Sequence, residues 1–333
     1  MDSRYDHLER YFCFMNSAMF GRIILTLITG GCLYCASAGA VTPPAAAPLP
    51  KKSDPLWEFS LLPRAFQKHP LLAISIITEM TDEGRKLKPP TPENPTYYYV
   101  FSAGFHEEGS VAVESGRVSN QDLEPRVQHA LAASGYLPGS PEHPPALLLV
   151  FFWGVHNKLD QGDIETGEGG FPDINHQNVL SRAALVGGTA FAKELAKALR
   201  EQDMLGGRMP SVFDPVYRFA NRDDLTRNLV EQVLDDCYYV VISAYDGASV
   251  ARGEKKLLWR TKMSTPAQGV SLVETTPALI DSGADFFGRE MKAASIVGKR
   301  ISRERGGRVD LGPMEFKGYM DKPGDKETPP EKK

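Results

Sequence analysis

The stretch Cys237–Lys262, CYYVVISAYDGASVARGEKKLLWRTK, contains the pattern on which the fold prediction rests. YYVVISAYD is an apolar run rich in β-branched and aromatic residues, which predicts a buried strand. KKLLWRTKM predicts the strand that returns beside it. Its alternation puts Leu258 and Arg260 on one face and Leu257, Trp259 and Thr261 on the other. DGAS predicts a turn, because Asp and Gly tolerate turn dihedrals and the Asp side chain can bond backbone N–H groups. Asp246 is therefore predicted to be a residue of a hairpin turn and not a catalytic carboxylate.

A strand, a helix and a second strand are predicted upstream of this hairpin. YYYVFSAGF (97–105) is strongly β-prone, and ALLLVFFWG (146–154) is an uninterrupted apolar strand. Between them SNQDLEPRVQHALAASGY predicts a helix that begins at the capping residue Ser119 and stops at Gly135. A right-handed crossover would place the two strands parallel in one sheet.

The remaining segments complete an α+β pattern. LLAISIITEM predicts a strand with Ile74 and Ile76 on one face and Ile77 on the other. Helices are predicted around LVGGTAFAK and in NRDDLTRNLVEQVLDD, and a last one in ETTPALIDSGADFFGREMKAASIVGKR, starting at its Thr-Pro. Residues 156–175 predict a long exposed loop. We expect a mixed β-sheet with helices packed mainly on one face, containing the strand-helix-strand unit and the later hairpin flanked by helices.

The N-terminal sequence has the features of an export signal. Arg22 precedes the uncharged run IILTLITGGCLYC and the small-residue stretch ASAGAV. Three outcomes fit this pattern: cleavage after Ala38 or Ala40, lipidation at Cys32, or retention as an uncleaved membrane anchor. The predicted organisation is a signal or anchor (1–40), a Pro/Ala linker (41–55), one α+β domain (56–310) and a disordered charged tail (311–333).

The composition narrows the choice of partner and compartment. The 333 residues carry a formal net charge of −4, so there is no basic excess to favour nucleic acid as a partner. The predicted location is the periplasm or cell envelope, with membrane association through the N-terminus. Only Cys237 remains in the exported part, where it predicts a buried, unreactive thiol and no internal disulfide.

None of the short motifs that mark a catalytic or cofactor site is present. The sequence has no nucleophile elbow Gly-x-Ser-x-Gly, no phosphate-binding glycine loop and no His or Cys spacing typical of zinc. His156 and His176 share the predicted loop, where we interpret them as solvated. The two glycines of LVGGTAFAK are interpreted as small residues that let helices approach, in preference to an anion site. No catalytic residue, metal ligand or cofactor is therefore predicted.

Three charged segments are weaker candidates. Glu79, Asp82 and Glu83 could act as acid and base if a cleft paired them, and DQGDIETGEGGFPD could hold calcium, although exposed turns and loops are the commoner outcome. The basic segment GKRISRERGGR could meet anionic lipid or cell-wall polymer, or could form the cationic end of a helix. Its basic residues are Lys299, Arg300, Arg303, Arg305 and Arg308.

The pattern as a whole resembles a known class of proteins. The features are a helix ending in Gly135 and Tyr136, the apolar strand Ala146–Phe152, and a strand leading through a turn to Leu258, Trp259 and Arg260 before a final helix. Over residues 96–295 this arrangement is similar to a broad class of uncharacterised bacterial envelope proteins and lipoproteins of unknown function. The resemblance implies an α+β domain outside the cytoplasm and brings no catalytic residues with it.

Two functional hypotheses follow. The first is a non-catalytic envelope component that binds a protein, glycan or lipid. The second is a hydrolase of an envelope polymer that uses a carboxylate pair. Convergence of Glu79, Asp82, Asp246 or the acids of 160–173 in a deep pocket would favour the hydrolase, whereas their scatter would favour the binding component.

Overall fold

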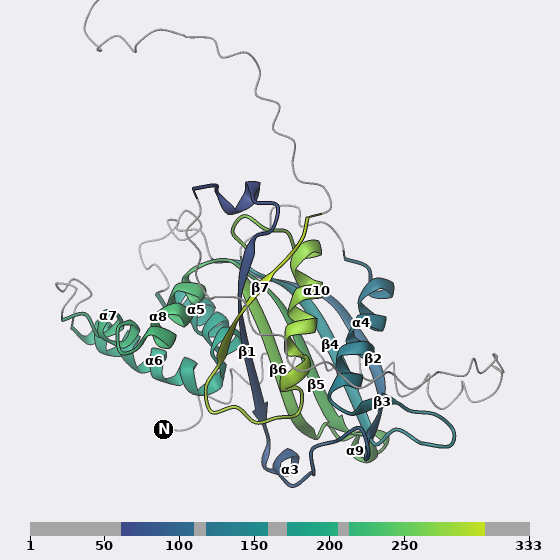
Figure 1. Cartoon of the computed structure of the whole chain (residues 1–333). Coiled ribbons are helices and arrows are strands. Elements are labelled where there is room, and N and C mark those ends of the chain that lie inside the picture. Colours follow the sequence, from purple (N-terminus) through teal and green to yellow (C-terminus); the bar gives the residue numbers. More distant parts are fainter. Residues whose placement is uncertain (1–60, 110–117, 159–171, 206–212, 304–333) are drawn as a thin grey trace, which may run out of the picture.

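A single mixed sheet of seven strands organises the protein. The computed structural model describes residues 61–109, 118–158, 172–205 and 213–303 (Figure 1). The predicted signal, the lipidation candidate Cys32, the linker and the charged tail all lie outside these ranges. The strand order is β3-β2-β4-β5-β6-β1-β7, which confirms the expected α+β class. The strands are β1 (Leu71–Met80), β2 (Thr96–Glu108), β3 (Tyr136–Pro138), β4 (Leu147–His156), β5 (Cys237–Asp246), β6 (Leu257–Pro266) and β7 (Ser295–Arg300).

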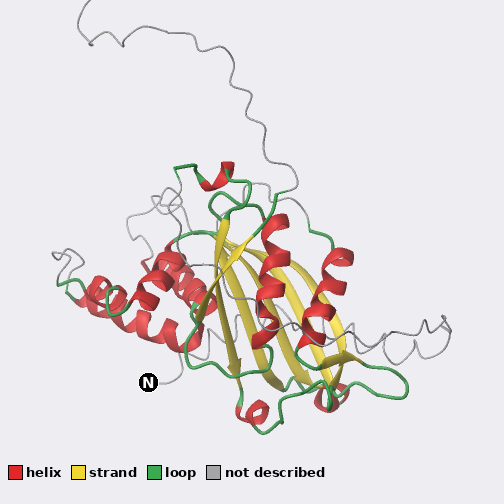
Figure 2. Cartoon of the chain, in the orientation of Figure 1, coloured by secondary structure: helices red, strands yellow, loops and turns green. Residues whose placement is uncertain are grey.

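Helices connect the strands and pack on the sheet (Figure 2). None of those in the described ranges combines the length and the apolar character needed to cross a bilayer. The α-helices are α3 (Asp82–Arg85), α4 (Asn120–Ala133), α5 (Pro172–Val186), α6 (Gly188–Met204), α7 (Pro215–Ala220), α8 (Asp224–Leu234), α9 (Gly247–Ala251) and α10 (Leu272–Gly283), and the 3-10 turns are η1 (Arg64–Phe66) and η3 (Ala284–Phe286).

The predicted strand-helix-strand unit is β2, α4 and β4. The two strands are parallel neighbours and stay in register from Tyr98 opposite Leu147 to Glu108 opposite His156. Ser119 caps α4 by accepting a hydrogen bond from the next turn, and after α4 Gly135 takes a φ of 82°, as the left-handed stop requires. After this stop the chain forms the short strand β3, which pairs with the beginning of β2.

The quoted hairpin is β5 and β6, which pair antiparallel, but its turn is the short helix α9. Asp246 caps this helix by accepting hydrogen bonds from the Ser249 backbone N–H and hydroxyl at 2.9 and 2.6 Å. The predicted alternation in β6 is wrong at Leu257 and Leu258, because Leu257 packs with Val150 and Tyr245 on the face opposite Trp259. A register shift brings Leu258 into the same core as Trp259, while Arg260 lies opposite Ser243 on the other face.

Helices cover both faces of the sheet, and not mainly one as expected. Helices α4 and α10 lie side by side over one face, as Figure 1 shows, and pack with Ile74, Ile76 and the inner residues of β4 and β5. Helices α5, α6 and α8 pack on the opposite face, where Ile77 points. The predicted division of β1 into two apolar faces is confirmed, and each face has its own helical layer.

The last segment that the structure describes differs from the predicted last helix. Helix α10 begins after Ser271, which forms a capping box with Glu274, and Pro277 lies inside the helix instead of at its start. The segment that follows turns back and forms β7, which pairs antiparallel with β1 along Leu71–Ile76. The β-branched residues of SIVG were a strand signal that the helical interpretation missed.

Candidate functional site

Glu79 holds the junction of α5 and α6. Its carboxylate accepts a hydrogen bond from the Thr189 backbone N–H at 2.7 Å, in the first turn of α6, and lies 2.7 Å from the Lys262 Nζ. Lys262 also donates to the Ala184 carbonyl at 2.8 Å. Burial alone would raise the pKa of Glu79, but the charge and hydrogen bond of Lys262 and the hydrogen bonds from Thr189 lower it. The Thr189 N–H, which follows the two glycines of LVGGTAFAK, therefore binds a carboxylate of the same chain.

The other nominated carboxylates have separate partners. Asp82 lies 2.6 Å from Arg85 within the same short helix α3, and Asp246 binds Ser249 in α9. The hydroxyl of Ser249 lowers the pKa of Asp246 despite partial burial, as do its backbone N–H and nearby cations. The 160–173 segment lies outside the part of the chain described in full. The carboxylates nominated from the sequence and visible here do not share a partner or a site.

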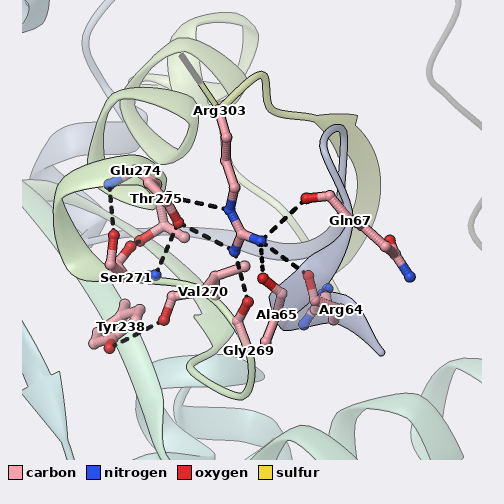
Figure 3. Close-up of polar contacts among 10 residues, drawn as sticks. All are labelled: Arg64, Ala65, Gln67, Tyr238, Gly269, Val270, Ser271, Glu274, Thr275 and Arg303. Carbon is pink, nitrogen blue, oxygen red and sulfur yellow. Dashed lines mark hydrogen bonds and ion pairs between the residues drawn. The ribbon is translucent and has the colours of Figure 1, made fainter. Parts of the chain in front are cut away.

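The basic residues of GKRISRERGGR also do not form one site. Lys299 and Arg300 belong to β7 and not to a helix end, and Arg305 and Arg308 lie beyond the described residues. Arg303 points inward and connects three segments (Figure 3). Its guanidinium donates to carbonyl oxygens of the segment at η1 and of the loop before α10, and it pairs with a carboxylate of α10. The acceptors are Arg64 O (3.0 Å), Ala65 O (2.7 Å), Gln67 O (3.1 Å), Gly269 O (2.7 Å) and Glu274 Oε1 (3.0 Å).

We expect Arg303→Lys to loosen this clamp and to lower the free energy of unfolding by about 1–2 kcal/mol, since an ammonium cannot reproduce the planar set of donors. Limited proteolysis should then cleave residues 61–70 faster than in the parent protein. Arg300→Lys, at an exposed arginine of the same segment, should leave both measurements within about 0.5 kcal/mol and twofold. Equal effects of the two substitutions would show that Arg303 is not a clamp.

A different group of polar residues lies at the carboxyl ends of the parallel strands β2 and β4. The chain leaves β2 for α4 on one face and leaves β4 for α5 on the opposite face. Adjacent parallel strands whose connections diverge in this way form a topological switch point, the position where open sheets usually bind ligands. Glu108 and His156 are the last residues of the two strands. The site is at the end of the sheet opposite α3 and α9 (Figure 1).

Glu108 and His156 face each other at this position. They are register partners, and Glu108 Oε2 lies 3.4 Å from His156 Nε2 without the geometry of a hydrogen bond. The strands remain paired to their ends, because the Asn157 N–H donates to the Glu108 carbonyl at 2.7 Å. Gly109, with a φ of 95°, approaches the Asn157 carbonyl so closely that a Cβ would overlap it.

Two side chains of β5 complete the group on the same face. Cys237 lies opposite His156 and Tyr239 lies opposite Gly154, both in the register of β4 with β5. The Tyr239 hydroxyl is close to the space that a side chain at position 154 would fill, since a Cβ there would be 2.9 Å from it. Neither this hydroxyl nor His156 Nε2 has a hydrogen-bond partner in the described structure.

Helix α5 closes the site from the other side. Arg182 is buried and donates to the Val233 carbonyl at 2.6 Å and to Asn178 Oδ1 at 2.7 Å. Asn178 in turn donates to the Asn157 carbonyl at 3.3 Å, which connects the helix to the end of β4. The hydrogen bonds of Arg182 thus fix a buried positive charge near the imidazole of His156 and the thiol of Cys237.

Burial controls the ionisation of the group. It raises the pKa of Glu108 and, together with the Arg182 charge, lowers that of His156 to about 4. Burial also raises the pKa of Cys237 to about 12 and that of Tyr239 well above its ordinary value. His156 is therefore a buried neutral residue of β4 and not a solvated loop residue. Cys237 is a buried, protonated thiol, as predicted, although a histidine does accompany it in space.

Protonation of His156 should make stability depend on pH. A histidine whose folded pKa is lowered stabilises the fold fully above its ordinary pKa of 6.5, and this contribution is lost as pH falls toward 4. Each pKa unit corresponds to about 1.4 kcal/mol, and the raised pKa of Glu108 acts in the opposite direction, so we expect a net loss of about 2 kcal/mol. His156→Gln should remove most of this loss in urea unfolding between pH 7 and pH 4.5. His129→Gln, at an exposed position, should retain it; equal pH dependence in both variants would contradict the assignment.

The geometry gives no support to a transition-metal centre in the described ranges. His176 lies in α5, 3.6 Å from Asp203 Oδ2, and does not share an element with His156. Within the described residues no three His, Cys, Asp or Glu side chains are grouped to hold a metal ion.

Comparisons with known proteins identify no family for this chain. A scan against protein-family models finds no match, and a search of curated proteins finds no similar sequence. The resemblance to bacterial envelope proteins stays a prediction that rests on the sequence pattern alone.

Proposed function

We propose that the protein is exported and acts in the cell envelope as a non-catalytic binding component. The export signal supports the location, and the site at the carboxyl ends of β2 and β4 supports binding. The observation that carries the non-catalytic part is the use of the nominated carboxylates as structural contacts: Glu79 holds α6, and Asp246 caps α9.

Fractionation of cells that express the full chain with a C-terminal tag tests the location. We expect the protein in the periplasmic or membrane fraction. Blocking lipoprotein signal processing should change its size only if Cys32 is lipidated, so this arm separates lipidation from simple cleavage. Recovery of the untrimmed chain from the cytosol would refute the proposal.

The alternative function is a hydrolase of an envelope polymer that uses a carboxylate pair. Glu79, Asp82 and Asp246 do not form such a pair, because each binds a different partner. Incubation of the purified protein with cell-wall polymer distinguishes the two functions. A binding component should sediment with the polymer and release no soluble fragments. Release of reducing ends that is lost in Glu108→Gln would favour the hydrolase, because Glu108 has the raised pKa that a general acid needs.

A further inference from the structure

One part of the sheet carries apolar side chains that no long helix of the described ranges covers. On the face that α5, α6 and α8 cover near β1, Val150 and Tyr245 form a small cluster with partly buried side chains of β2, β4 and β6. Among the described residues, the helical side chain of this cluster is Val250 of the short helix α9. Figure 1 shows α5 to α8 gathered at the β1 side of the sheet, away from β2. Parallel strands are normally covered on both faces, so the open face of β2 and β4 is a candidate binding surface.

Aromatic side chains follow this open face along the whole of β2. Tyr97 stacks on His143 at the beginning of the strand, with ring centroids 4.5 Å apart and planes 5° apart. At its end, His106 and Phe152 meet edge to face with centroids 5.1 Å apart. Tyr99 lies between these pairs and is 54% exposed. We call this set of residues the aromatic strip, and each of its members is at least partly exposed: Tyr97, Tyr99, Phe101, His106, His143 and Phe152.

The charge and the length of the aromatic strip favour an uncharged chain molecule. Between Tyr97 and His106, the side chains that β2 and β4 place on this face carry no formal charge. Burial lowers the pKa of His106, so its imidazole is neutral at pH 7. A polyanion such as nucleic acid would find no cation among these side chains. The strip follows β2 for about 30 Å at roughly 3.3 Å per residue, a length that suits several linked units laid along the strand.

The surroundings of the strip point to sugars as these units. Helices α5, α6 and α8 rise one helix diameter, about 10 Å, above the same face of the sheet, and this step keeps a flat bilayer from lying on the strip. Sugar rings have apolar C–H faces that stack on aromatic rings. Their hydroxyl groups can bind the phenols of Tyr97 and Tyr99 and the imidazole of His143. The strip also ends at the switch point, the position where open sheets usually bind ligands.

We propose that the aromatic strip binds a linear chain of neutral sugar units of an envelope glycan. This inference rests on the proposed binding function and specifies the class of ligand and the surface that holds it. One sugar ring stacks on the exposed Tyr99. Neighbouring units along the same chain reach the pair of Tyr97 and His143 at one end and the pair of His106 and Phe152 at the other.

Calorimetric titration of the purified exported chain tests the proposal. The probes are a hexamer and a dimer of N-acetylglucosamine and a hexamer and a dimer of glucose, all of them neutral. We expect at least one hexamer to bind in a saturable way, and its dimer to bind about tenfold or more weakly, because the dimer covers only part of the strip. No saturable binding of either hexamer, or equal affinities of a hexamer and its dimer, would overturn the proposal.

A matched pair of variants on β2 separates the strip from the rest of the surface. Tyr99→Ala should weaken hexamer binding about tenfold or more, because it removes the most exposed ring of the strip. Phe105→Ala removes a ring that is 44% exposed on the same strand, but Phe105 lies opposite Trp153 and therefore on the other face, so its affinity should stay within about twofold of the parent. Urea unfolding confirms that both variants fold. Equal losses of affinity in the two variants would refute the strip.

Two further measurements identify other occupants of the same face. The peptide TPPAAAPLP, residues 42–50 of this chain, represents a proline-rich ligand, and sedimentation velocity detects a second copy. Peptide binding or self-association that Tyr99→Ala abolishes, without binding of either hexamer, would overturn the proposal. If Tyr99→Ala still sediments with cell-wall polymer as the parent does, this inference fails while the proposed function stands.

Discussion

Gly154→Ala is expected to lower the free energy of unfolding by about 4 kcal/mol or more, which places it among the most damaging single substitutions. Gly154 lies in β4 opposite His106 of β2, and a Cβ at this position would overlap the His106 carbonyl oxygen. Because the obstacle is backbone in a paired strand, a change of side-chain rotamer cannot relieve it. The same Cβ would be 2.9 Å from the Tyr239 hydroxyl, so the substitution also disturbs the switch-point site.

Gly104→Ala is the matched control for this effect. Gly104 lies in β2 at a bulge and has a φ of 87°, but an added Cβ would meet no atom within 4 Å. Its cost should be limited to the left-handed conformation, about 1–2 kcal/mol. Urea unfolding followed by fluorescence compares the two variants. Losses that agree within about 1 kcal/mol would show that backbone contact does not decide the role of Gly154.

The sequence was sufficient for those elements in which local pattern and tertiary role agree. The β5–β6 hairpin, the parallel pair around α4 and the two faces of β1 were all predicted, because long apolar runs and clear capping residues define them. Asp246 was correctly interpreted as a residue that binds backbone N–H groups. Its place at the start of a short helix, and not in a tight turn, depends on contacts that no local pattern contains.

Most residues of the candidate site could not be predicted from the sequence. Glu108 lies beyond the strand predicted at 97–105, and His156 was assigned to an exposed loop. One usable signal existed: both residues follow strands predicted to be parallel, and the carboxyl ends of parallel strands meet at one edge of the sheet. The positions of Tyr239 and Cys237 beside them follow from the register of β4 with β5, which pairs residues about 80 positions apart and has no sequence motif.

The sequence alone could not decide whether LVGGTAFAK binds an anion or lets helices pack, because the answer depends on residues from distant strands. The glycines do end one helix and begin the next, but the N–H group of Thr189 is bound by Glu79 from β1. Glu79 and Lys262 come from adjacent strands and are separated by 183 residues along the chain. No spacing rule connects two residues so far apart, whereas the structure shows them as one ion pair beneath the helix junction.

Lys262→Met should lower the free energy of unfolding by about 3 kcal/mol, as expected when one partner of a largely buried ion pair is removed. The Lys262 side chain is 8% exposed, and its loss would remove the ammonium that binds Glu79 Oε2 and the Ala184 carbonyl. The effect is placed at the lower end of the usual range because Glu79, at 30% exposure, retains some solvation. Urea unfolding at pH 7 provides the measurement.

Adding Glu79→Gln to Lys262→Met tests whether the unpaired charge causes this loss. The amide oxygen can still accept the hydrogen bond from Thr189, so the start of α6 keeps its cap while the buried negative charge is removed. We expect the double variant to be more stable than Lys262→Met alone by about 1–2 kcal/mol, a coupling that two independent substitutions would not show. A double variant whose loss equals the sum of the two single losses would contradict the ion-pair explanation. It would assign the role of Lys262 to the packing of its aliphatic stem between β6 and α5 instead.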